Sequence, residues 1–285
     1  MSRAPTPGAA NPLVLVAVQM LSLQVGAAVA VGLMAHVGIV GAAFARVALA
    51  CAVVGLLLRP RPRVADRRSL LLATALGVVI AVMNTAYFGA VVHLGLGLAT
   101  TIEFLGPFLV GLVSARQAAD LLWSMVAAAG VVLIAGVGEV SGTGLALGLL
   151  AAGCRAGYIV LTRAVGDLFD GASGLFVALL VGTVVAAPFA VGTFPGFGDV
   201  GVLGLAAAVA VLSSAVPYLC DMASLRKLRT SSFSVLLALS PAVSALAGLV
   251  LLGQDLSPPQ WCGVGAVVLA GAASVLTAPR VEETG

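Results

Sequence analysis

Three charged residues, Arg46, Glu103 and Arg155, fall well inside long apolar stretches of this 285-residue sequence. A charge near the centre of an apolar layer costs about 2.5–3.5 kcal/mol or more, so it normally has a function or a partner. An arginine guanidinium can bind a carboxylate through two hydrogen bonds, and a glutamate can bind an ammonium group or a proton. The same residues could instead form a buried ion pair that joins helices, and the sequence leaves both interpretations open.

Uncharged polar side chains accompany these charges in the apolar stretches. Asn84 and Tyr87 are three residues apart, as are Arg155 and Tyr158, so each pair shares one face of a helix. Polar side chains on such helices usually face other helices, either as hydrogen-bond partners or as contacts to a ligand. The candidate binding residues are therefore Gln24, Arg46, Asn84, Tyr87, Glu103, Arg155, Tyr158 and Tyr218.

Three prolines, Pro107, Pro217 and Pro241, are candidate helix breaks. Proline has no N–H to bond the carbonyl four residues earlier, which for Pro107 is the carbonyl of Glu103. An open backbone in an apolar layer is tolerated where a cavity or a neighbour satisfies it. We therefore expect the backbone to open beside the buried acid.

The composition predicts an integral membrane protein. The chain is 61% hydrophobic and 9% charged, whereas soluble domains are roughly 45–50% apolar and about 25% charged. This excludes a soluble enzyme, a nucleic-acid-binding protein and a disordered chain. The four cysteines lie singly in apolar runs, and we find no metal-binding, P-loop or hydrolase motif. We therefore expect no metal site, no cofactor and no enzymatic activity.

Apolar runs of about 20 residues, the length that spans a bilayer, follow one another along the chain. We interpret the first as a retained span and not a signal peptide, because similar runs follow it and no convincing cleavage site is present. The expected fold is all-α, with ten transmembrane helices. The predicted spans are 13–34, 37–58, 69–91, 95–114, 121–138, 145–163, 171–191, 200–220, 232–252 and 260–278.

Basic residues are distributed unequally among the loops. Twelve of the 14 Lys and Arg residues fall on the same side as both termini, and the opposite loops carry only Glu139, Asp199 and Asp255. The remaining two are Arg46 and Arg155, inside spans. The positive-inside rule predicts that both termini are cytoplasmic.

The two halves of the chain look alike. AAGVVLIAGV (128–137) resembles GVGAVVLAGA (263–272), and a similar offset places Pro107 on Pro241. The same offset aligns the loop VVHLGLG, which is uncharged and predicted to be outside, with the loop SLRKLRT, which is basic and predicted to be inside. Five spans per half is an odd number, so the second copy is expected to be inverted, as in many transporters. The predicted units are a tail (1–12), two five-helix repeats (13–140 and 141–278) and a second tail (279–285).

Seven short strings are spread in order over nearly the whole chain: SLQVGAAVA (22–30), ARVALA (45–50), MNTAYF (83–88), IEFLGP (102–107), LSSAVPYLCDM (212–222), LSPAVSALAGLVLLG (239–253) and PPQW (258–261). In these strings the sequence resembles the EamA-type branch of the drug/metabolite transporter superfamily, and within it the bacterial threonine/homoserine exporter group. Arg46 and Glu103 match positions of the family pattern. Arg155 stands where the family prefers an aromatic residue, and Ser240 stands where many relatives carry Glu.

The resemblance and the buried charges together predict a secondary exporter of small amino acids similar to threonine or homoserine. It would work by alternating access, with Glu103 as the proton-coupling group. The alternative is an exporter of another small metabolite, an aromatic amino acid or a drug-like amphiphile. A membrane scaffold is disfavoured, because it would gain little from charges near the bilayer centre. The expected partners are a small amino acid, protons and the lipid bilayer, and not nucleic acid; the exact substrate and the oligomeric state stay open.

Overall fold

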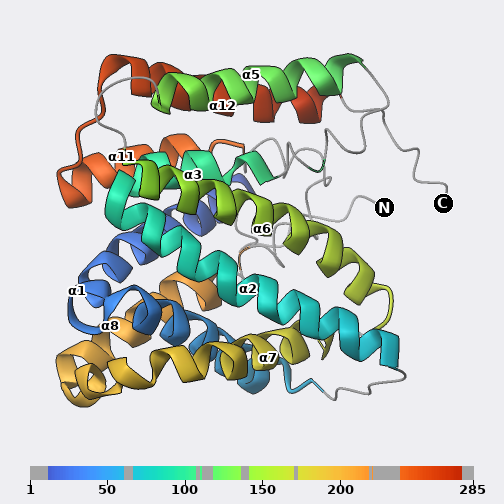
Figure 1. Cartoon of the computed structure of the whole chain (residues 1–285), viewed down its shortest axis with the longest axis vertical. Coiled ribbons are helices and arrows are strands. Elements are labelled where there is room, and N and C mark those ends of the chain that lie inside the picture. Colours follow the sequence, from blue (N-terminus) through green and yellow to red (C-terminus); the bar gives the residue numbers. More distant parts are fainter. Residues whose placement is uncertain are drawn as a thin grey trace, which may run out of the picture.

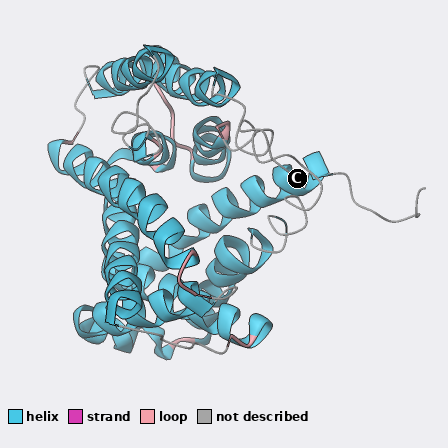
Figure 2. Ribbon diagram, turned by 90° about the vertical axis from the view of Figure 1, so that its right-hand side faces the viewer, coloured by secondary structure: helices cyan, strands magenta, loops and turns pink. Residues whose placement is uncertain are grey.

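The computed structural model describes residues 12–60, 67–106, 110, 118–135, 141–169, 173–217, 220 and 238–277. Every regular element in this part of the chain is helical, as the composition predicted (Figures 1 and 2). The elements are α1 (Pro12–Leu58), α2 (Arg67–Leu94), α3 (Leu96–Glu103), α5 (Ala118–Ala135), α6 (Gly142–Gly166), α7 (Ser173–Ala190), the 3₁₀ helix η1 (Val191–Gly198), α8 (Val200–Ala210), the π-helical turn η2 (Val211–Ala215), α11 (Ser240–Leu252) and α12 (Pro258–Thr277).

The first two predicted spans form the two legs of α1, which bends at Gly38. The backbone of Gly38 has φ 68° and ψ 177°, a conformation that residues with a Cβ rarely adopt and that glycine tolerates. Figure 1 shows the two legs meeting at the left edge of the molecule and both running back from it. A single glycine thus replaces the loop expected between residues 34 and 37.

Helix α2 packs against α6 on one side and α7 on another, and α1 packs against α7 and α8. The contact between α2 and α7 is close, because a Cβ on Gly182 would lie 2.8 Å from the carbonyl oxygen of Gly77. Helices α5 and α12 cross in the same way, since a Cβ on Gly130 would lie 2.8 Å from the carbonyl oxygen of Gly263. The α5–α12 pair covers α3 and α11, which contact each other. In a bilayer the hydrophobic effect does not drive helices together, and small residues at such crossings allow the close packing that holds them.

Four stretches are long and apolar enough to cross a membrane: Leu13–Leu58, Arg67–Leu94, Gly142–Gly166 and Ser173–Gly198. The described parts of the other predicted spans are also helical but shorter. The predicted span 95–114 contains α3, which ends at Glu103, and the described part of 232–252 is α11, which begins at Ser240. The structure therefore agrees with an all-helical membrane protein, while the count of ten spans and their inverted repetition stay predictions.

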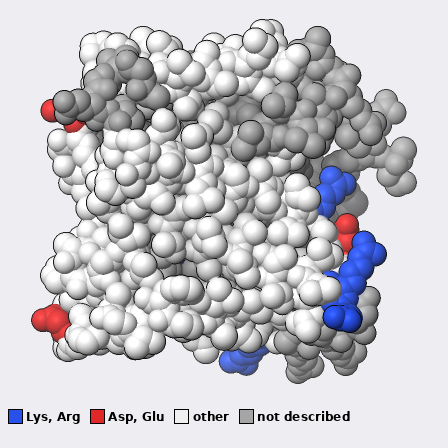
Figure 3. Space-filling view, viewed as in Figure 1, with Lys and Arg blue, Asp and Glu red and all other residues white. Residues whose placement is uncertain are grey.

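The visible surface is largely uncharged, with the charges confined to its edges (Figure 3). Basic side chains lie toward the right and lower edges of this view, together with one acidic group, and the left edge carries acidic groups. Large apolar side chains such as Leu56, Phe189 and Val250 are exposed on the described helices. A surface of this kind fits contact with lipid chains.

Candidate functional site

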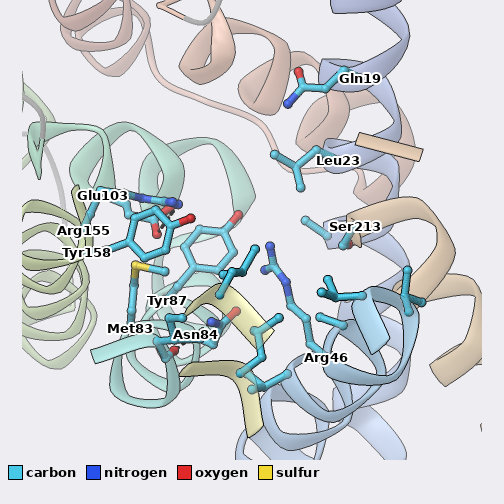
Figure 4. A pocket seen from close by; sticks show the side chains of 18 of the residues that line it. Gln19, Leu23, Arg46, Met83, Asn84, Tyr87, Glu103, Arg155, Tyr158 and Ser213 are labelled. Atoms are coloured by element: carbon cyan, nitrogen blue, oxygen red, sulfur yellow. Dashed lines mark hydrogen bonds and ion pairs between the residues drawn. The ribbon is translucent and has the colours of Figure 1, made fainter. Parts of the chain in front are cut away.

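A cavity of about 440 Å³ lies among α1, α2, α3, α6, α7, η2 and the start of α11 (Figure 4). It brings together seven of the predicted binding residues: Gln24, Arg46, Asn84, Tyr87, Glu103, Arg155 and Tyr158. The eighth, Tyr218, lies outside the described residues, as does Pro107. Residues from both halves of the sequence thus converge on one space.

Glu103 and Arg155 form an ion pair on the cavity wall. Arg155 Nη2 donates to Glu103 Oε1 at 2.8 Å. Helix α3 ends at Glu103, and the Arg155 stem packs on nearby Gly106, where a Cβ would lie 2.6 Å from Arg155 Cβ. The glutamate side chain is 9% exposed and the arginine side chain 35%. The guanidinium, 5.9 Å from the ring centre of Tyr158, therefore remains partly accessible from the cavity.

Arg46 points into the same cavity from the second leg of α1 (Figure 4). Its guanidinium lies over the ring of Phe88, 5.6 Å from the ring centre, a cation–π contact. It has no carboxylate within ion-pair distance among the described residues. Counting the described lining residues, two arginines and one glutamate give the cavity a formal charge of +1. Among the described lining residues, Arg46 is therefore the arginine that has no carboxylate partner.

Uncharged groups complete the polar part of the cavity. The hydroxyl oxygens of Tyr87 and Thr100 are 3.0 Å apart, and Ser244 Oγ lies 2.8 Å from Thr100 Oγ1 as a donor. Asn84 Nδ2 donates to the carbonyl of Ile80 at 2.8 Å, which leaves its Oδ1 for another partner. The wall thus offers acceptors as well as cationic donors.

The helix around Pro217 opens beside the cavity. In η2 the N–H of Val216 bonds the carbonyl five residues back, on Val211. Pro217 has no N–H to continue this pattern, and the carbonyl of Leu212 instead accepts a hydrogen bond from Ser22 Oγ at 2.8 Å. Such π turns are often found at functional sites, and Ser213 in this turn lines the cavity.

Pro241 lies at the start of a described helix. It lies in the first turn of α11, which begins at Ser240, and not in the interior of a described helix. Proline is favoured in a first turn, where a missing N–H breaks no intrahelical bond. Residues 221–237, which precede this region, are outside the described part of the chain.

The sequence interpretation missed several lining residues. Gln19, Thr100, Ser213 and Ser240 contribute polar groups, and Gln19 was detectable because it shares an α1 face with Leu23 and Ala27, four and eight residues later. The remaining lining residues that were not predicted are apolar: Leu23, Ala27, Val47, Ala50, Val53, Val54, Leu57, Leu58, Ile80, Met83, Phe104, Leu175 and Leu179. Apolar residues carry no signal that separates a cavity wall from a helix contact. Metal-binding groups of three or more His, Cys, Asp or Glu residues are absent from the described part of the chain.

Comparison with known proteins gives consistent results. The model of the EamA-like transporter family matches residues 142–276. The threonine/homoserine exporter RhtA of Escherichia coli (strain K12) is 33% identical over 272 residues, which are 93% of this chain and 92% of that protein. RhtA of Salmonella typhimurium (strain LT2) is 32% identical over 94% of this chain and 92% of its own. A solved crystal structure with 18% identity aligns with a TM-score of 0.60 over 96% of this chain and 100% of that one, which supports the fold.

These relatives extend over nearly the whole sequence, so they cover both sequence halves that line the cavity. The resemblance inferred from the short strings is confirmed. With its apolar helices and its central charged cavity, the chain is a multi-pass membrane protein that belongs to the EamA-like transporter family, a family of membrane transporters and not of enzymes.

Proposed function

We propose that this protein is a proton-coupled secondary exporter of small amino acids similar to threonine or homoserine. The observation that carries the proposal is the cavity, in which an Arg46 without a carboxylate partner among the described residues faces the Glu103–Arg155 pair. The name of the relatives that cover 92% or more of both chains points to the same substrate class. The sequence and the site thus support one function from independent directions.

In this proposal, Arg46 binds the substrate carboxylate through its two parallel N–H groups. The ammonium group meets the acceptors on the opposite wall, which are the carboxylate of Glu103 and Oδ1 of Asn84. The hydroxyl groups of Tyr87 and Thr100, already bonded to each other, fix the shape of the wall between them. Gln24 and Tyr158 line the same space and complete the contact surface.

Proton coupling would act through the ion pair. While Glu103 is ionised, it holds Arg155 at 2.8 Å. Protonation would remove the charge that holds the guanidinium, and Arg155 could then turn toward the cavity and the substrate. This exchange links proton binding to a change in the charge presented to the substrate, which is what a coupled transporter needs.

The shape of the cavity supports loading from the cytoplasm. Along α1 the lining residues reach Leu57 and Leu58 at the end of the helix, beside the exposed Arg59. Around the bend of α1, in contrast, Leu33, Phe88 and Leu96 pack in a closed apolar core. We propose that the basic end is cytoplasmic, with both termini there and the protein in the bacterial inner membrane.

The packing of the helices supports the proposed inverted repeats, 13–140 and 141–278. In the proposed repeats, α2 of the first half corresponds to α8 of the second, and the first leg of α1 corresponds to α6. Helix α2 packs on α6, and the equivalent pair with the halves exchanged, α8 and α1, is also in contact. Helices α3 and α11 contact each other, and so do α5 and α12. In both pairs, the two helices occupy equivalent positions in the two halves. Exchange of the two halves would therefore preserve the main contacts, as rocking about a shared site requires.

A second candidate function is export of a larger metabolite, an aromatic amino acid or a drug-like amphiphile. It is favoured by the apolar lining toward the basic end, where Leu57, Leu58 and Leu175 lie, and by a volume within the range of drug-sized pockets. Competition between substrates separates the two candidates.

The test is counterflow of radiolabelled threonine in proteoliposomes, with unlabelled amino acids and amphiphiles as competitors. Arg46→Gln should abolish uptake, and Arg46→Lys should restore only part of it, because lysine lacks the planar fork. Glu103→Gln should abolish transport driven by a proton gradient. Arg67→Gln, at the exposed start of α2, is the matched control and should transport normally. Normal transport by Arg46→Gln would contradict the proposed binding mode.

A further inference from the structure

Gln19 places an unused amide in the wall of the cavity. The residue is 6% exposed, and its Oε1 atom is buried without a hydrogen-bond partner. In Figure 4 the side chain extends from α1 into the cavity on the same wall as Leu23 and Ser213. None of the hydrogen bonds described above involves this residue.

Its position along α1 separates Gln19 from the charged centre. Gln19 lies 19 residues before the bend at Gly38, and Arg46 lies eight residues after it. At ~1.5 Å per residue, Gln19 is about 16 Å further from the bend than Arg46 along the helix axes. Both side chains are long and project into the cavity, so their polar groups lie closer together than their backbones do. They still line different parts of one cavity.

The lining residues of α1 nearest to Gln19 in sequence are mostly apolar. Leu23 and Ala27 share its face of the first leg, and Gln24 is the other polar lining residue described on this leg. The first charged lining residue of α1 is Arg46, beyond the bend at Gly38. Leaving an amide group unpaired among apolar residues costs stability, and an apolar residue of the same size would avoid the cost. The side chain extends into the cavity, and a rotation of its carboxamide group would allow a bound molecule to pair with it.

The chemistry of the amide limits what that group can be. A carboxamide offers one acceptor oxygen and two N–H donors, so its best partner both donates and accepts, as a hydroxyl or another amide does. The cavity also falls in the volume range of ligands larger than a small amino acid.

We infer that Gln19 is a specificity-determining residue, which forms a second subsite for the uncharged polar end of an elongated amino acid whose carboxylate is held at Arg46. The inference rests on the proposed function and extends it, because it names the part of the substrate that the first leg of α1 contacts. Homoserine carries this polar end as a hydroxyl, and glutamine carries it further out as an amide. Longer substrates reach the subsite better than threonine does.

The test compares two pairs of ligands of matched length, glutamine with methionine and homoserine with norvaline. Their affinities are measured by ligand-induced thermal stabilisation of the full-length protein in nanodiscs, and by inhibition of threonine counterflow. In the unmodified protein the polar member of a pair should bind about tenfold better, which corresponds to one or two net hydrogen bonds. The glutamine arm and the homoserine arm distinguish an amide from a hydroxyl as the preferred group.

In Gln19→Met this preference should disappear, while methionine and threonine bind within about threefold of their original affinity. The variant should also unfold at the same or a higher temperature, because it removes an unpaired amide. Val18→Met, at a neighbouring position that is 42% exposed, is the matched control and should keep the preference.

The outcomes separate this inference from the proposed function. If amino acids bind but the polar and apolar members of each pair bind equally, or if Gln19→Met keeps the preference, Gln19 does not read the substrate and the exporter proposal stands. An equal loss of affinity for all four ligands in Gln19→Met would assign the residue a structural role and overturn the inference. If none of the amino acids binds to the unmodified protein, both proposals fall.

Discussion

Removing either member of the Glu103–Arg155 ion pair should destabilise the protein, but by unequal amounts. Arg155→Met leaves a carboxylate that is 9% exposed, whereas Glu103→Gln leaves a guanidinium that is 35% exposed. A buried charge that loses its partner costs about 3–5 kcal/mol, and a charge that reaches solvent costs roughly 1 kcal/mol or less. Because Arg155 is partly exposed to the cavity, we expect about 2–3 kcal/mol for Arg155→Met and about 1 kcal/mol for Glu103→Gln.

Thermal unfolding in nanodiscs, followed by the fluorescence of Trp123 and Trp261, measures this difference. The double variant should be more stable than Arg155→Met, with a coupling free energy of about 1–3 kcal/mol.

Equal destabilisation by the two single changes would refute the reasoning from exposure. Additive effects in the double variant would mean that the two side chains do not interact in the membrane.

Two further predictions concern packing and topology. Gly106→Ala should destabilise the protein by about 1–3 kcal/mol and reduce transport, because the added Cβ would lie 2.6 Å from Arg155 Cβ. In the same unfolding assay the control Gly153→Ala, which has open space around its Cβ, should leave stability unchanged. Equal effects of the two changes would contradict the packing argument. Reporter fusions after Arg63 should report a cytoplasmic location and fusions near Asp199 an external one; a cytoplasmic signal at Asp199 would reverse the proposed orientation.

The sequence by itself determined the class of the protein and most of its charged site. Low charge and long apolar runs predict membrane helices whatever their arrangement, because each helix must satisfy its own backbone in lipid. The cost of an intramembrane charge is likewise a property of the single residue, so Arg46, Glu103 and Arg155 could be selected before any contact was known. The short strings were sufficient to identify the family.

Tertiary structure alone decided how these residues are used. Glu103 pairs with Arg155 and leaves Arg46 without a carboxylate partner among the described residues, a choice that depends on the close contact between Gly106 and the Arg155 stem. The bend at Gly38 sets Gln19 and Arg46 at different depths of one cavity. Leu57 and Leu175 became cavity residues only through packing, because nothing in an apolar side chain distinguishes a wall from a contact. Burial costs are local and can be read along the chain, whereas the choice of partner depends on differences of an ångström between helices distant in sequence.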